Sequence, residues 1–100
     1  MPRISLHTLF EDARKRAYTA CYCEAWNLES FEAVIDAAEE TESPIIAGFN
    51  GGFLCHSGRQ RAENLAHYAT LGHALWQSSA PAVFLLNETD DFAQVELAIG

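Results

Sequence analysis

The sequence is poor in basic residues, with six lysines and arginines against fourteen aspartates and glutamates, and its formal net charge is -8 at pH 7. A chain this acidic repels nucleic acid and anionic membrane surfaces at long range, so we expect neither as a partner. It also lacks an apolar run of ~20 residues and a signal-peptide pattern at its start. These absences predict a cytoplasmic protein without a membrane segment.

Cysteine and proline are scarce too, at three residues each. Three cysteines cannot all pair with one another, which excludes a disulfide framework, and a reducing compartment keeps them as thiols. A zinc site can be drawn from Cys21, Cys23, Cys55 and His56, but a Cys-x-x-Cys pair is missing, and small buried side chains are the simpler interpretation. The remaining composition, 49% hydrophobic over 100 residues, supports a single domain over residues 1–100, which we expect to be a partial one.

Apolar residues recur at helical spacing in four segments. The first two are residues 5–16 and 28–40, and Ser5 and Asn27 are placed to cap them. A third apolar stripe runs from residue 65 to a stop near residue 78; its members are Leu65, Tyr68, Ala69, Gly72, Leu75 and Trp76. The last helix carries Phe92, Val95 and Ile99; Thr89, Asp90 or Asp91 can cap it and Gly100 can end it.

Three short β-prone or apolar segments lie between these helices and are expected to be strands, at residues 18–26, 45–49 and 82–86. Residues 51–61 are expected to be irregular. Strands that alternate with helices run parallel, so the chain is predicted to be an α/β protein. The two later strands are apolar on successive residues, which indicates burial of both faces.

Two architectures fit this pattern. Strands in the order 1-2-3 place their linking helices on one face, because such crossovers are right-handed. The other face is then covered only if further units close a TIM (β/α)8 barrel, for which ~250 residues are typical, and this chain would be its N-terminal portion. The alternative is a small flavodoxin-like three-stranded sandwich in the order 2-1-3, with helices on both faces.

Several segments resemble the class II fructose-bisphosphate and tagatose-bisphosphate (ketose-bisphosphate) aldolases. Residues 4–18, ISLHTLFEDARKRAY, look like the family's opening helix, and residues 27–46, NLESFEAVIDAAEETESPII, like its first barrel helix and second strand. Asn50-Gly51-Gly52 resembles the loop that follows, and residues 81–100 fit the third strand and helix. The resemblance implies a metal-dependent aldehyde-lyase ancestry in carbohydrate metabolism, with a sugar phosphate as substrate and a divalent metal, zinc, as cofactor.

The third strand of that family ends in His-x-Asp-His, a pattern that falls on Leu85, Asn87 and Glu88 and is not retained. The Asp is the family's acid/base and the second His a metal ligand, so the resemblance implies Asn87 as a catalytic position and Glu88 as the metal-side residue. Asn87 cannot exchange a proton, whereas Glu88 can offer an oxygen ligand. Glu24 stands where the family has a substrate-binding Asn and becomes the nearest replacement acid/base.

Polar residues follow each expected strand and form a rim rich in oxygen acceptors: Glu24, Asn27, Asn50, Asn87, Glu88 and Asp90. Such a rim suits a hydrated cation or a polyol, and we take Asn27, Asn50, Gly51 and Gly52 as candidate substrate-binding residues. Helix capping is the competing interpretation for Asn27 and Asp90, and a tight turn is the competing one for the glycines.

His56, Arg59 and Arg61 share one loop, which can bind an anion or simply be solvated.

The expected function is that of an aldolase-like protein of sugar-phosphate metabolism, inactive as this 100-residue chain because the family's remaining metal ligands and phosphate loops belong to later strands. The alternative is a non-enzymatic α/β binding module or barrel fragment that self-associates as a homo-oligomer to bury the open face of its sheet.

Overall fold

Helices and strands alternate along the chain in the computed structural model, which describes residues 3–99 apart from the side chains of residues 75, 76, 98 and 99. The elements are α1 (Leu6–Arg16), β1 (Tyr22–Ala25), α2 (Leu28–Glu40), β2 (Ile45–Asn50), α3 (Gly51–Leu54), α4 (Leu65–Gly72), the 3-10 helix η1 (His73–Gln77), β3 (Ala82–Asn87) and α5 (Phe92–Ile99). Ser5 and Asn27 cap α1 and α2 as expected. The expected roles of the Leu75, Trp76 and Ile99 side chains and of Gly100 fall outside the described residues.

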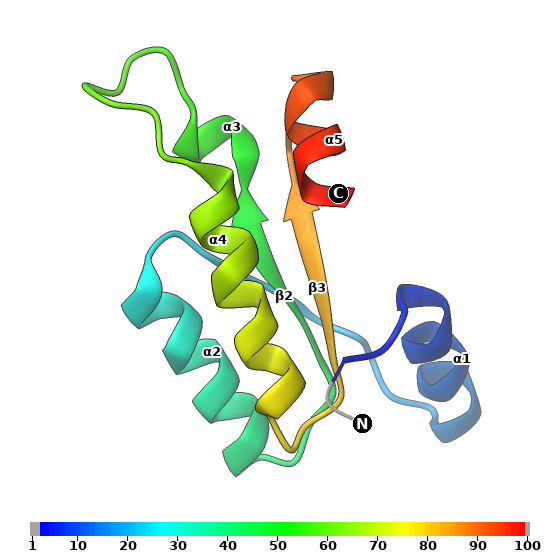
Figure 1. Cartoon of the computed structure of the whole chain (residues 1–100). Coiled ribbons are helices and arrows are strands. Elements are labelled where there is room, and N and C mark those ends of the chain that lie inside the picture. The colour runs from blue at the N-terminus through cyan, green and yellow to red at the C-terminus, as the bar shows by residue number, and fades with distance from the viewer. Residues whose placement is uncertain (1–2, 100) are drawn as a thin grey trace.

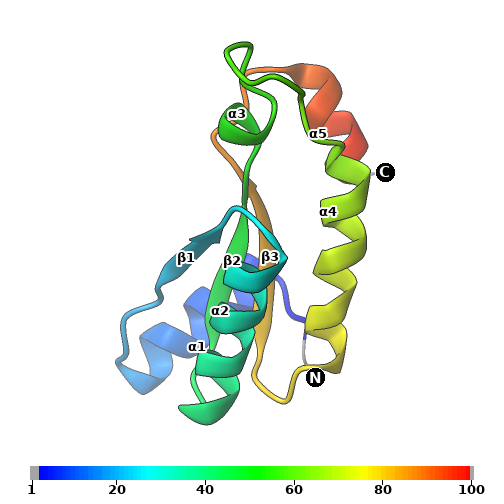
Figure 2. The ribbon, with the colours of Figure 1, turned by 90° about the vertical axis from the view of Figure 1, so that its left-hand side faces the viewer.

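The three strands form one parallel sheet in the order β1-β2-β3. This order shows that the flavodoxin-like 2-1-3 alternative is wrong, because β2 and not β1 is the central strand. The linking helices α2 and α4 lie together on one side of the sheet and α1 lies on the other (Figure 1; Figure 2). The chain therefore has the parallel α/β fold expected for part of a β/α barrel.

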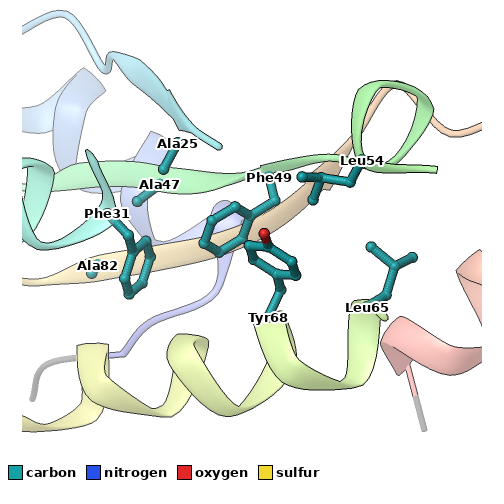
Figure 3. Packing of buried hydrophobic residues seen from close by; sticks show 8 residues of the cluster. All are labelled: Ala25, Phe31, Ala47, Phe49, Leu54, Leu65, Tyr68 and Ala82. Carbon is teal, nitrogen blue, oxygen red and sulfur yellow. The ribbon is translucent and has the colours of Figure 1, made fainter. Parts of the chain in front are cut away.

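The main core lies between the sheet and the two linking helices. Phe49 of β2 is 1% exposed and stacks on Phe31 of α2 with ring centroids 5.2 Å apart. The ring of Tyr68, from α4, meets Phe49 edge-on at 4.4 Å (Figure 3). Small residues on the same face of the strands, Ala47 and Ala82, are fully buried beside these rings. Aromatic rings over alanines thus fill the space between sheet and helices.

A second, smaller core lies on the opposite face of the sheet, under α1. Leu9 of α1 is 1% exposed and packs with Ile46 of β2 and Val83 of β3. These strand residues lie toward the amino ends of their strands. Since side chains alternate along a strand, the residues farther along this same face include Asn50 and Asn87. The face covered by α1 at one end is therefore polar at the other.

The first strand is shorter than the sequence predicted, beginning at Tyr22 rather than near residue 18. Ala17 adopts a left-handed conformation with φ 55° and ends α1, and the N–H of Tyr18 still bonds to the carbonyl of Ala13. The ladder with β2 opens on a bond from the Ile46 N–H to the carbonyl of Cys21. β-prone residues before that point have no place in the ladder.

Three other expectations about local structure need correction. The segment expected to be irregular after β2 begins with the one-turn helix α3, because the Asn50 side chain accepts a hydrogen bond from the Phe53 N–H at 2.9 Å. The α-helix that starts at Leu65 changes to 3-10 geometry after Gly72. Phe92, expected on the apolar stripe of the last helix, is 73% exposed. Asp91 caps that helix by accepting from the Ala93 N–H at 2.9 Å.

Candidate functional site

The carboxyl ends of the three strands bring four of the predicted site residues into one hydrogen-bonded network. Asn87, the last residue of β3, donates through Nδ2 to Glu24 Oε1 of β1 at 3.2 Å, across the width of the sheet. Asn50, the last residue of β2, donates through Nδ2 to Glu88 Oε2 at 2.9 Å. The register pairs Asn50 with Asn87, so the two amides lie side by side. We call this set of residues, Glu24, Asn50, Asn87 and Glu88, the rim site.

Glu24 is held by a second donor that the sequence analysis missed. The hydroxyl of Tyr22 donates to the same Oε1 atom of Glu24 at 3.2 Å. Burial raises the pKa of Tyr22, and the neighbouring charge of Glu24 raises that pKa further, so the phenol stays protonated and remains a donor. Tyr22 lies two residues before Glu24 on one strand, and this spacing was the available signal.

Glu88 has an unusual backbone conformation for a residue with a side chain. Its φ is 46°, in the left-handed region, which costs a non-glycine residue ~1 kcal/mol or more. Its carbonyl accepts from the Gly52 N–H at 2.9 Å, while its carboxylate accepts from Asn50. A Cβ at Gly52 would lie 2.7 Å from that carbonyl oxygen. The second glycine of the Gly51-Gly52 pair therefore lets the loop after β2 reach the loop after β3.

An open groove of ≈ 830 Å³ lies beside the rim site. Its lining combines the rim residues Asn50 and Glu88 with Gly51, Gly52, Phe53, Cys55, His56, Ser57, Thr89, Asp90 and Gln94. Most of its side-chain polar groups are oxygen acceptors. The arrangement is suited to a ligand that carries hydroxyl groups.

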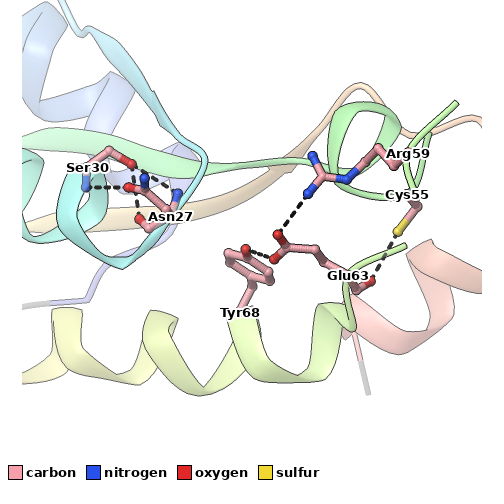
Figure 4. A network of polar contacts seen from close by, with 6 residues as sticks. All are labelled: Asn27, Ser30, Cys55, Arg59, Glu63 and Tyr68. Atoms are coloured by element: carbon pink, nitrogen blue, oxygen red, sulfur yellow. Dashed lines mark hydrogen bonds and ion pairs between the residues drawn. The ribbon is translucent and has the colours of Figure 1, made fainter. Parts of the chain in front are cut away.

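Asn27, the remaining predicted site residue, is not part of this network. Its Oδ1 accepts from the Ser30 N–H at 2.8 Å, and the Ser30 hydroxyl accepts from the Asn27 N–H at 3.1 Å, which is a capping box at the start of α2 (Figure 4). The side chain thus has a structural task. Substrate binding by Asn27 stays a prediction.

A second polar cluster anchors the loop between α3 and α4. Glu63 accepts from Arg59 Nη2 at 2.9 Å through one carboxylate oxygen and from the Tyr68 hydroxyl through the other (Figure 4). The Arg59 guanidinium also lies over the ring of Phe53, 5.1 Å from its centroid. Arg59 is therefore engaged within the protein, and of the two loop arginines proposed for anion binding only Arg61 has no side-chain contact among the described residues.

Alkaline unfolding should report on this cluster. Burial and the hydrogen bond to Glu63 raise the pKa of Tyr68 to about 12, against 10.0 in an unfolded chain. A group whose pKa is raised by folding contributes stability below the unfolded value and loses it as the pH rises through the folded value. We expect the free energy of unfolding to fall between pH ~10 and ~12, and to fall less in Tyr68→Phe. Denaturant titrations over this range measure it; an equal fall in the variant would contradict the assignment.

No three histidine, cysteine, aspartate or glutamate side chains gather to hold a metal ion within residues 3–99. Cys21 is exposed and precedes β1, while Cys23 and Cys55 are partly buried, and all three are free thiols. The zinc site drawn from these cysteines is therefore wrong for the described part of the chain. None of the helices in that part is long and apolar enough to cross a membrane.

Comparison with known proteins gives three findings. The family model for class II fructose-bisphosphate aldolase matches residues 4–99. The uncharacterized protein YdjI of Escherichia coli (strain K12) is 39% identical over 56 residues, which are 56% of this chain and 19% of YdjI. The crystal structure of the YdjI aldolase from E. coli K12 has the same fold, with a TM-score of 0.79 at 22% identity, over 97% of this chain and 35% of that one. The chain thus spans about a third of that structure's length.

Proposed function

Because this chain belongs to the class II fructose-bisphosphate aldolase family, we propose that it forms the first three β/α units of an aldolase barrel that acts on a sugar phosphate in the cytoplasm. The observation that carries the proposal is the hydrogen bond from Asn87 to Glu24. It joins the carboxyl ends of the two outer strands, where barrel enzymes place their catalytic groups.

In this proposal Glu24 is the proton-transferring acid/base. Asn87 has no titratable group, so its amide can bind a substrate oxygen or orient Glu24 but cannot carry a proton. Glu24 supplies the carboxylate at a distance of 3.2 Å from that amide. Asn50 and the glycines after it face the groove and are the proposed substrate-binding positions.

Zinc, the metal that the family implies, fits these residues only in part. Carboxylate oxygens can bind a divalent metal, and Glu88 is the rim residue that we propose as a ligand. Its carboxylate already accepts from Asn50 and Asn87, and no further two ligand side chains gather with it among the described residues. The rim therefore contributes one ligand at most. We accordingly propose that the 100-residue chain has no aldol-cleavage activity by itself.

The experiment is aldol cleavage of a ketose bisphosphate by a complete barrel that contains this chain, followed by trapping the triose phosphate product. Glu24→Gln should lower kcat by ~10²- to 10⁴-fold, because the amide cannot transfer a proton. Glu32→Gln, on the exposed face of α2, is the matched control and should leave kcat unchanged. Equal turnover in the two variants would remove Glu24 from the mechanism, and a wild-type barrel without cleavage would sink the proposed function.

Self-association as a non-enzymatic module is the second candidate. It is favoured by the strand order, since β1 and β3 are both outer strands of the sheet, with Arg3 pairing only with Ala82 at the start of β3. Unpaired outer strands add to other strands readily. Sedimentation of the chain distinguishes the candidates: a dimer that ketose bisphosphates do not affect favours the module.

A further inference from the structure

His56 contributes a nitrogen donor to a groove otherwise lined by oxygen acceptors. Its side chain lines the groove beside the rim site, together with Glu88 and Asp90. Its Nδ1 accepts a hydrogen bond from the Gly58 N–H at 2.9 Å. A ring nitrogen that accepts carries no proton, so in the neutral ring the proton is on Nε2. No hydrogen bond to Nε2 is formed within the part of the chain that the structure describes.

The loop that carries His56 is held at both ends by Glu63. The Glu63 N–H bonds to the carbonyl of Leu54 at 3.0 Å, and its own carbonyl accepts from Cys55 Sγ at 3.5 Å. Its carboxylate is bound by Arg59, whose N–H in turn bonds to the carbonyl of His56 at 3.1 Å (Figure 4). Backbone and side chain of one residue thus close the loop and fix the peptide of His56.

The chemistry of the groove limits which part of a ligand His56 can meet. The carboxylates of Glu88 and Asp90 repel a phosphate group and accept from hydroxyl groups. The Asn50 amide already donates to Glu88, and the Gly52 N–H to the Glu88 carbonyl. A carbonyl or hydroxyl oxygen in this groove therefore needs another donor, and Nε2 of His56 is available.

We propose that His56 donates a hydrogen bond from Nε2 to an oxygen of an uncharged polyhydroxy or ketose segment of the ligand, and that Glu63 is the positioning residue for His56. The identity of this ligand as the uncharged end of a sugar phosphate rests on the proposed function. The orientation of His56 and the anchoring of its loop rest on the geometry alone.

The test uses dihydroxyacetone as the probe, titrated into the chain while the imidazole signals of its histidines are followed by NMR. The His56 signals should shift in a saturable way, and His56→Ala should raise the Kd by about 3- to 10-fold, the effect of one hydrogen bond. His67→Ala is the matched control, since His67 is an exposed histidine of α4 that lines a different groove. Inorganic phosphate should leave the His56 signals in place.

Glu63→Gln tests the positioning role, because the amide keeps the shape of the side chain but loses the charge paired with Arg59. It should raise the Kd in the wild-type background and have no further effect in His56→Ala, a non-additivity that a merely structural role would not produce. Absence of binding, or binding that His56→Ala leaves unchanged, would overturn the inference. Neither outcome touches the role of Glu24, which cleavage by the complete barrel decides separately.

Discussion

Replacing Phe49 with alanine is expected to lower the free energy of unfolding by about 3–5 kcal/mol, the usual cost of removing a buried aromatic ring. Phe49 is 1% exposed and lies at the centre of the aromatic cluster, in contact with Phe31, Tyr68 and Phe84. The cavity left behind would be walled by three rings on two helices and a strand, which cannot all move into it. A domain of this size has ~5–15 kcal/mol of stability in total, so this loss is a large share of it.

Phe92→Ala is the matched control for this prediction, since it deletes the same atoms from a side chain that is 73% exposed. We expect it to change the free energy of unfolding by less than ~1 kcal/mol. Urea titrations followed by circular dichroism measure both variants. Similar losses at the two positions would mean that the ring of Phe49 is not the centre of the core.

Local structure could be predicted because it depends on neighbours in the sequence. Asn27 stands before an apolar stripe at helical spacing, and both the cap and the helix α2 are present. The strand order could not be predicted in the same way. Right-handed crossovers allow both 1-2-3 and 2-1-3, and the choice depends on which strand has two neighbours, a contact between residues distant in sequence.

The rim site could be predicted in outline, since parallel strands bring their carboxyl ends to one edge and the polar residues there had to meet. Its details depend on contacts that spacing does not reveal. The left-handed backbone of Glu88 is held by a hydrogen bond from Gly52, 36 positions away. Glu63 was overlooked because its partners, Arg59 and Tyr68, come from a loop and a helix whose packing the sequence pattern does not specify.

Substitution of Gly48 by alanine should be the most damaging change of a single methyl group in this chain, at about 3 kcal/mol or more. Gly48 is buried in the central strand β2, and a Cβ there would fall on the backbone carbonyl of its register partner Leu85. In an ordinary strand position the same change stabilises by ~0.5–1 kcal/mol, because alanine restricts the unfolded chain. Here the obstacle is backbone, which can move only if β3 separates from β2.

The control for Gly48→Ala is Gly51→Ala, where the atom closest to the new Cβ is Oε1 of the flexible Gln94 side chain, at 2.7 Å. That side chain can rotate away, so we expect a loss below ~1 kcal/mol. Hydrogen exchange then separates a local clash from general instability: in Gly48→Ala the amides that pair β2 with β3 should lose protection before those that pair β1 with β2. Wild-type stability in Gly48→Ala would show that the two strands do not approach as closely as this register requires, and the distance between Glu24 and Asn87 across the rim would then be in question as well.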